Sequence, residues 1–233
     1  MTSLPSFELT PALEQALLKQ IEAEAAKAAA EADKEAQYAL AQKVQTDALL
    51  RAEKDDLNHD RYHHHYMFDK AVDSLTVGRC LNELSLWHRD DPECDMTITM
   101  RSPGGDVVAG MHLFDELDAY SLRGEGSHKV TMIVRGYAAS MAGILLQAAD
   151  ERVIGRNASL LIHPVSSWAE GGLHELKDKV KWLDQLTDRV TEIFLERSEG
   201  KISRGDFIKS LERRDWWLTA DESLNFGFAD RLG

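Results

Sequence analysis

The fold of this chain is decided by the stretch Gly136-Tyr137-Ala138-Ala139-Ser140-Met141-Ala142-Gly143. The β-rich run before it predicts a strand over 130–134 that ends at Gly136, and the apolar residues after it predict a helix over 139–149. Ser140 would then lie at a helix start, where backbone N–H groups are unpaired and the helix dipole is positive. That environment favours a nucleophilic oxygen and the oxyanion formed when it attacks a carbonyl. A serine at a helix start is more often an N-cap, so this fragment alone does not establish catalysis.

A second turn lies upstream, at Ser102-Pro103-Gly104-Gly105, after a β-rich run over 96–100 and before a predicted helix over 107–120. Proline fixes its own φ, and the glycines permit backbone angles that other residues avoid. Such a turn can aim a backbone N–H at a substrate oxygen. The alternative is a tight strand-to-helix turn without a functional role.

A histidine and an acid downstream complete a candidate constellation. His163 ends a short apolar strand, where it is either a core residue or a base presented at the strand end. Asp215 precedes Trp216 and Trp217, which could shield its carboxylate and strengthen a bond to an imidazole. The alternative is a surface Asp paired with one of the two arginines before it, Arg213 and Arg214. A serine, a histidine and an acid at element ends meet the requirements of a catalytic triad, although spacing alone does not show that they converge.

Strands and helices alternate over residues 58–233, which predicts an α/β fold. The other expected elements are a strand over 61–68, a helix over 71–88, short strands over 153–154 and 160–162, a long amphipathic helix over 173–199, a short helix over 207–211, an extended segment over 217–219 and a last helix over 221–226.

Residues 1–57 form a separate region of different composition. From Thr10 to Asp56 there is no glycine, Pro11 is the only proline, and Ala, Glu, Gln and Lys dominate. These residues predict a long helical extension, with Thr10 as N-cap and Pro11 in the first turn. The apolar positions in its middle are nearly all Ala, so the apolar stripe is weak. Two interpretations remain: a solvated helical extension, or a coiled-coil or assembly arm.

Composition restricts the class of protein. The 233 residues carry a formal net charge of −13, which disfavours binding to nucleic acid or to an anionic membrane surface. No apolar run approaches the length of a membrane helix, and the first ten residues lack the features of a secretory signal, so we expect a cytoplasmic protein. The spacing of Cys80 and Cys94 suggests neither a disulfide nor a metal site.

The run His63-His64-His65 offers two histidines that would share one face of a strand. A metal site would need a third ligand, and none is evident at a helpful spacing. We therefore predict neither a metal nor a cofactor, and prefer a polar, pH-sensitive strand at a subunit contact.

Taken together, these segments resemble the proteolytic subunit of the Clp protease, a family of serine peptidases. The similarity covers roughly residues 60–233. The matching segments are Ser102–Gly105 with Gly110, Gly136–Gly143, Leu161–Pro164, Gly171–Gly172, Arg214–Glu222 and Gly227–Asp230.

The resemblance implies a crotonase-like α/β fold and assigns a role to each candidate. Ser140 would be the nucleophile, His163 the base and Asp215 the orienting acid, selected over Asp206 and Glu212 by the register of the segment that follows it. The backbone N–H groups of Gly105 and Met141 would form the oxyanion hole. The residues expected to bind substrate are Gly104, Gly171 and Gly172, the last two beginning an element that pairs with the polypeptide as an added strand.

The resemblance also implies assembly into heptameric rings or double rings, in which the helix over 173–199 joins two rings. The family's short N-terminal gating loop is replaced here by the Ala/Glu-rich helix. Thr97 and Thr99 stand where aromatic residues often help to dock an ATPase, and Arg101 stands where Asn is common, so the resemblance does not extend to control by a Clp ATPase. These departures indicate a divergent member, of the kind that phages encode among head-maturation genes.

The predicted function is therefore a serine endopeptidase that cleaves polypeptides inside a homo-oligomeric chamber. One alternative is a non-proteolytic scaffold or assembly protein that keeps the fold. Two others rank lower: an acyl-CoA enzyme of the crotonase type, and a Ser-Lys peptidase that uses one of the lysines Lys177, Lys179 and Lys181.

Overall fold

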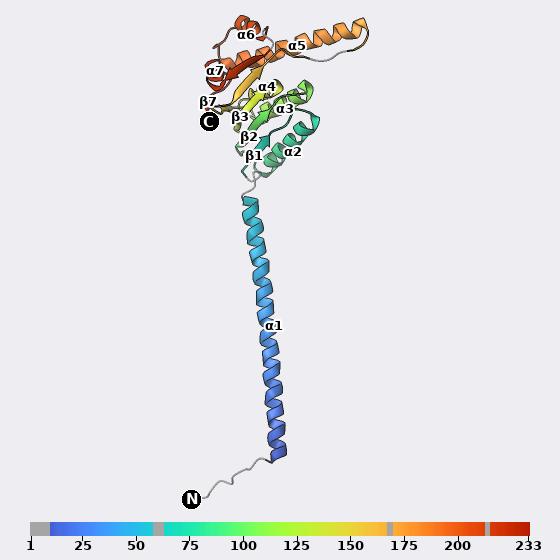
Figure 1. Ribbon diagram of the computed structural model, residues 1–233, viewed down its shortest axis with the longest axis vertical. Helices are drawn as coiled ribbons and strands as arrows, with labels where there is room; N and C mark the ends of the chain where they lie inside the picture. The colour runs from blue at the N-terminus through green and yellow to red at the C-terminus, as the bar shows by residue number, and fades with distance from the viewer. Residues whose placement is uncertain (1–9, 58–62, 167–169, 213–214) are drawn as a thin grey trace. The chain divides into compact units, whose positions relative to one another are not determined.

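The computed structural model describes residues 10–57, 63–166, 170–212 and 215–233 (Figure 1). The chain divides into two units, residues 1–58 and 59–233. Three parts of the sequence analysis concern residues outside this description. They are the expected lack of a secretory signal in the first residues, the start of the strand expected over 61–68, and the pairing of Asp215 with Arg213 or Arg214.

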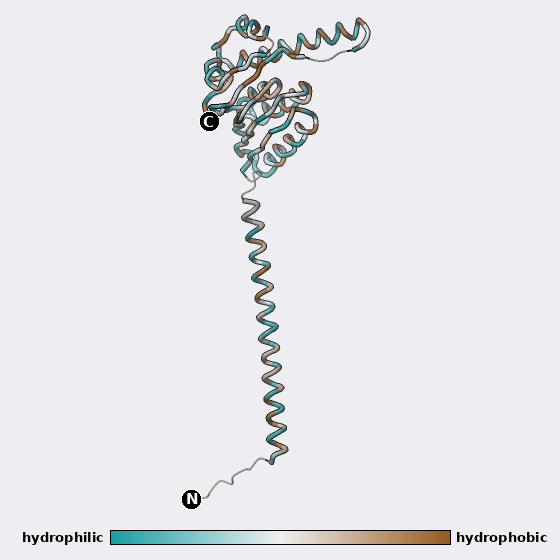
Figure 2. The backbone as a smooth tube through the Cα atoms, viewed as in Figure 1, coloured by the Kyte–Doolittle hydropathy of each residue, from teal (hydrophilic) through white to brown (hydrophobic). Residues whose placement is uncertain are grey.

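The first unit contains one long helix, α1 (Pro11–Leu57), which confirms the predicted helical extension. Every α1 side chain described is exposed, including apolar ones such as Leu17 and Val44. Figure 2 shows hydrophobic and hydrophilic positions interspersed along its length. Because its residues are mostly strong helix formers, the local sequence favours this helix without a packed face.

The second unit has an α/β fold built on one sheet, as predicted. The strands are β1 (His65–Phe68), β2 (Met96–Ser102), β3 (Val130–Ala139), β4 (Glu151–Ile154), β5 (Ser159–Ile162), β6 (Trp216–Thr219) and β7 (Arg231–Leu232). Parallel pairing runs β1-β2-β3-β4-β7. β5 also pairs parallel with the last part of β3, and β6 pairs antiparallel with β5.

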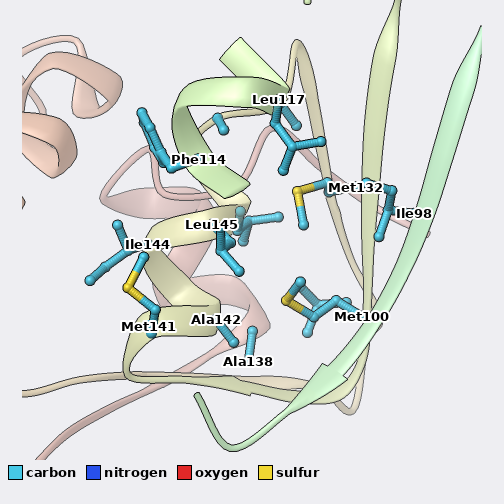
Figure 3. Close-up of a cluster of buried hydrophobic side chains, with 14 of the residues drawn as sticks. Ile98, Met100, Phe114, Leu117, Met132, Ala138, Met141, Ala142, Ile144 and Leu145 are labelled. Atoms are coloured by element: carbon cyan, nitrogen blue, oxygen red, sulfur yellow. The ribbon is translucent and has the colours of Figure 1, made fainter. Parts of the chain in front are cut away.

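The described residues of this unit also form six helices: α2 (Ser74–Asp90), α3 (Val107–Tyr120), α4 (Met141–Leu146), α5 (Leu173–Ser198), α6 (Arg204–Leu211) and α7 (Ala220–Asn225). Helix α3 packs against both α2 and α4, and α4 also contacts α5. Figure 3 shows part of the resulting core, in which side chains of β2 and β3 such as Met100 and Met132 meet those of α3 and α4 such as Leu117 and Leu145. All four of these side chains are fully buried, as a parallel sheet covered by helices requires.

Strand β3 is longer than the predicted strand, and this difference positions the site. The prediction ended it at Gly136, but the strand continues to Ala139. Gly136 has a φ of +81°, so it bends the strand without ending it. The first half of β3 pairs with β4, and the half after the bend pairs with β5. Helix α4 consequently begins at Met141, two residues later than expected.

Candidate active site

Ser140 occupies the turn between β3 and α4. Its backbone has φ 55° and ψ −125°, a conformation that residues other than glycine rarely adopt and that stores strain. Its N–H donates to the Leu161 carbonyl at 2.9 Å, which holds the turn against the end of β5. Such a sharp strand-to-helix turn is the geometry that presents a nucleophilic serine in hydrolases.

The side chain of Ser140 does not act as a helix cap. The residue stands at the N-cap position of α4, but its hydroxyl makes no capping hydrogen bond. Among the described residues, that hydroxyl has no hydrogen-bond partner at all. The N-cap alternative raised by the sequence therefore does not explain this serine, and its oxygen is available for chemistry.

The turn at Gly104 and Gly105 lies directly against Ser140. A Cβ on Gly104 would come within 2.7 Å of the Ser140 Cβ and 2.8 Å of the Met141 nitrogen, so only glycine allows this approach. On the far side, the Val72 N–H donates to the Gly104 carbonyl at 2.8 Å and the Val72 carbonyl accepts from Asp106 at 2.8 Å. This bridge makes the Gly105 N–H point away from Val72.

At this site, the backbone N–H groups of Gly105 and Met141 have no acceptor among the described residues. Met141 is the first residue of α4, whose N–H has no partner within the helix. Its side chain is fully buried and lies where Gly110 of α3 carries no side chain, since a Cβ there would be 2.2 Å from the Met141 Cγ. That packing fixes the start of α4, and with it the direction of the Met141 N–H.

A cavity of about 80 Å³ joins these groups to His163. Its lining residues are Gly105, Val107, Ser140, Met141, Ile144, Ile162, His163, Val165, Ser166 and Val190. The structure therefore brings together four of the predicted site residues: Ser140, Met141, Gly105 and His163. Most of the other lining side chains are apolar, and an apolar wall strengthens charge interactions within the cavity.

His163 follows β5, and its Nδ1 lies 2.7 Å from the Pro164 carbonyl oxygen. A carbonyl only accepts hydrogen bonds, so this contact requires the proton on Nδ1. In the neutral ring, Nε2 is then the unprotonated nitrogen, which is the form that can take a proton from a hydroxyl. The histidine is half-buried at the cavity wall, so it is not a fully buried core residue.

Asp215 and His163 each lie one residue beyond the last pair of the β5–β6 ladder, at the same end of it. The register pairs Ile162 with Trp216, and one further step in this antiparallel ladder would place Asp215 opposite His163. Side chains that are directly opposite share one face of the sheet and lie close together. Asp215 is exposed, and within the described residues no hydrogen bond joins it to His163, whose Nδ1–H is directed to Pro164.

The tryptophans beside Asp215 differ in environment. Trp216 packs edge-on against the rings of Phe207, Phe226 and Phe228, on the face of β6 opposite to Asp215. Trp217 shares the face of Asp215 but is 53% exposed. The expected shielding of the carboxylate by Trp216 is therefore wrong, because the pleat directs that ring into the core.

Comparison with known proteins identifies the family of the second unit. A family model described as Clp protease matches residues 58–233. The chain belongs to the Clp protease family. Among its relatives is the ATP-dependent Clp protease proteolytic subunit 2 of Tropheryma whipplei, 27% identical over 70% of this chain and 87% of the relative. The ATP-dependent Clp protease proteolytic subunit 1 of Streptomyces avermitilis is 27% identical over 78% of this chain and 85% of the relative.

Membership of the Clp protease family confirms the resemblance and the fold class, and the low identity agrees with a divergent member. The phage origin stays a prediction. The family match begins at residue 58 and leaves α1 outside it. No helix among the described residues is long and apolar enough to cross a membrane.

Gly171 and Gly172 lie at the start of α5 in this Clp protease family member. Gly172 is the N-cap, and its N–H donates to the Glu175 carboxylate at 2.8 Å. Gly171 has a φ of +147°, and a Cβ there would lie 2.2 Å from the Glu175 Oε2. Both glycines are exposed and neither lines the cavity, so their role in binding substrate stays a prediction.

The histidine run does not form the strand face that was expected. His63 and His64 lie in a turn, with φ +49° at His64, and only His65 belongs to β1. The His65 Nε2 lies 2.9 Å from the Thr99 hydroxyl. Within the described residues, no group of three or more His, Cys, Asp or Glu side chains could hold a metal ion.

Sequence reasoning missed two contributors to the site. Val72 orients Gly105 through a backbone bridge, and any residue type except proline could supply those backbone atoms. Pro164 supplies the carbonyl that sets the His163 tautomer. The Pro164 contact is local, and the sequence His163-Pro164 could have suggested it, whereas the Val72 bridge carries no local signal.

Proposed function

We propose that this chain is a serine endopeptidase that hydrolyses peptide bonds of polypeptides. Its membership of the Clp protease family supports peptidase chemistry. The observation that carries the proposal is the strained Ser140, whose hydroxyl caps no helix and which lines one cavity with His163.

In the proposed mechanism, the Ser140 Oγ attacks the peptide carbonyl carbon while the His163 Nε2 takes its proton. The negative charge that develops on the carbonyl oxygen is stabilised by the N–H groups of Gly105 and Met141. His163 then gives the proton to the leaving amine, and the C–N bond breaks to leave an acyl ester on Ser140. Water, activated by the same histidine, hydrolyses that ester and restores the hydroxyl.

Asp215 would accept the Nδ1–H of His163 and stabilise the imidazolium. This role requires the His163 Nδ1–H to exchange the Pro164 carbonyl for the carboxylate at the same end of the ladder. We infer that substrate binding or subunit assembly favours that exchange, since an aligned triad is needed only when a peptide is bound.

We further propose that the chain works as a homo-oligomer, in heptameric rings or double rings, with α5 at the contact between rings. The relatives are named proteolytic subunits, which supports assembly. Gly104, Gly171 and Gly172 would border the polypeptide. The names of the relatives also include ATP dependence. In this chain, one position expected to dock an ATPase through an aromatic ring is Thr99, and its hydroxyl is bonded to His65.

The test is covalent labelling of the intact protein with a fluorophosphonate, which reacts with activated serines. We expect one label per chain on the wild type and none on Ser140→Ala. The matched control is Ser210→Ala, which removes a hydroxyl bonded to a helix carbonyl on α6 and should label as the wild type does. Equal labelling of wild type and Ser140→Ala would overturn the assignment of the nucleophile.

A non-proteolytic assembly protein is the second candidate. The contact of the His163 Nδ1 with Pro164 in place of Asp215 favours it, because the triad is then not aligned. Casein cleavage by purified wild-type oligomers separates the two functions. Cleavage that disappears in Ser140→Ala supports the peptidase, and the absence of cleavage by assembled wild-type protein that has not been treated with the probe supports the scaffold.

A further inference from the structure

A second cavity, apart from the proposed active site, is lined mainly by charged side chains. It lies between the C-terminal parts of α3, α4 and α5 and has a volume of about 100 Å³. Its lining residues are Phe114, Asp118, Arg123, Gln147, Arg189, Ile193, Glu196 and Arg197. That volume accommodates roughly three water molecules or one small polyatomic ion.

Two N–H donors at this cavity are buried without an acceptor. They are the Nε atoms of Arg123 and Arg197, both inaccessible to solvent and without a hydrogen-bond partner among the described residues. Unsatisfied buried donors are rare in folded proteins, and each one calls for an explanation such as a bound ion or ordered water. Because solvent reaches neither Nε, an ion in the cavity would meet the Nη groups instead, and the two unpaired donors mark a cation-rich wall that is short of acceptors.

The carboxylates near the cavity are already engaged by other groups. Asp118 and Glu196 both pair with Arg123. Asp150 accepts hydrogen bonds from three backbone N–H groups, and Asp230 pairs with the buried Arg152.

Arg197 is consequently left without a carboxylate of its own. Within the described residues, its side chain donates one hydrogen bond, from Nη2 to the Ala149 carbonyl at 2.8 Å. Arg189, which also lines the cavity, makes no ion pair within the described residues. Burial, together with the charges of Arg152 and Arg123, lowers the pKa of Arg197 to about 10. A buried cation beside two others is stabilised by a counter-ion.

We propose that this cavity binds a small tetrahedral oxyanion of the phosphate class. Arg197 would donate through Nη1, which has no partner among the described residues, and Arg189 would close the open side, while Arg123 adds positive charge at the wall. Charge-assisted bonds from guanidinium to a tetrahedral oxyanion are among the strongest that proteins form. The site is independent of the proposed peptidase chemistry, although α5 borders both cavities through the neighbouring residues Arg189 and Val190.

The experiment is equilibrium dialysis of the full chain against radiolabelled inorganic phosphate, at an ionic strength held constant with sodium chloride. We expect saturable binding of one phosphate per chain, and a thermal transition that rises with phosphate but not with added chloride. Arg197→Gln should weaken phosphate binding at least about tenfold, since it removes a charge-assisted donor. Arg189→Gln, at an exposed position that cannot threaten folding, should weaken it as well.

The matched control is Arg156→Gln, which removes an exposed arginine outside the cavity and should bind phosphate as the wild type does. The proposal is overturned if phosphate binding is not saturable, or if it raises the thermal transition no more than chloride does. It is also overturned if Arg189→Gln, folded as judged by circular dichroism, binds phosphate as tightly as Arg156→Gln.

Discussion

Replacing Gly104 by alanine should disable the site without removing any proposed catalytic group. A Cβ at this position would lie 2.4 Å from the Ala139 carbonyl oxygen, 2.7 Å from the Ser140 Cβ and 2.8 Å from the Met141 nitrogen. These atoms belong to the turn that carries the nucleophile. The φ of +82° at Gly104 adds backbone strain for any residue with a Cβ.

The magnitude follows from these distances. Ordinary contact begins near 3.4 Å, so the Gly104 turn and the Ser140 turn must separate by about 1 Å. A displacement of that size at reacting groups costs about 10²-fold in rate. For stability, a left-handed conformation costs alanine about 1–2 kcal/mol. Overpacking of a tight contact adds about 1–3 kcal/mol. We therefore expect Gly104→Ala to lose about 2–5 kcal/mol in the free energy of unfolding.

The assay is the second-order rate constant of fluorophosphonate labelling, measured beside urea unfolding for each variant. Two glycines provide matched controls, since a Cβ at either one meets no atom within 4 Å. Gly200 has a φ of +81°, so Gly200→Ala should lose about 1–2 kcal/mol of stability from strain alone and keep its labelling rate. Gly78 lies within α2, and Gly78→Ala should gain about 0.5–1 kcal/mol.

The reasoning is refuted if folded Gly104→Ala reacts with the probe within twofold of the wild-type rate. It is also refuted if Gly200→Ala loses as much reactivity as Gly104→Ala, because general destabilisation would then explain both results. A loss confined to Gly104→Ala ties the reactivity of Ser140 to the separation of the two turns.

Three further predictions concern other parts of the chain. Asp215→Asn should slow casein cleavage by two orders of magnitude or more, whereas Glu212→Gln should not; equal rates for the two variants would remove Asp215 from the triad. Burial alone would raise the pKa of Asp230, but its bonds to Arg152 outweigh burial and hold the pKa below its ordinary value. The pair therefore stabilises the fold above about pH 4, and this stabilisation is lost as the pH falls through the lowered pKa. Asp230→Asn should therefore lower the free energy of unfolding by about 2 kcal/mol at pH 7, as measured with urea. This is less than for a fully buried pair, because Asp230 is 37% exposed. A loss of the same size at pH 3 would contradict the assignment. Deleting residues 1–56 should leave the second unit folded and change the mass of the particle; an unchanged mass by light scattering would show that α1 has no part in assembly.

Much of the second unit could be predicted from local sequence. The helix expected over 107–120 is α3 to the residue, because Asp106 caps its start and an apolar face marks its length. The helix expected over 173–199 is α5 within one residue. The composition of residues 10–56 specified α1, since helix propensity acts locally and needs no partner.

The candidate residues Ser140, His163 and Asp215 were also visible in the sequence, but the convergence of Ser140 and His163 on one cavity was not. That convergence depends on strand pairing between residues far apart in the chain. β3 bends at Gly136 so that its end reaches β5, and the antiparallel ladder of β5 with β6 then brings Asp215 to the same end as His163. Register of this kind is a property of two segments together, and no local periodicity encodes it.

Ser140 shows the difference between what the sequence determined and what the tertiary structure decided. The sequence by itself determined that Ser140 begins a helix after a strand, a place where most serines are N-caps. Only the tertiary structure decided that its hydroxyl caps nothing and lines a cavity with His163 and Gly105. The physical reason is the positive φ of Ser140, which is maintained by a hydrogen bond to β5 and by the close approach of Gly104, two contacts made by segments that are distant in the chain.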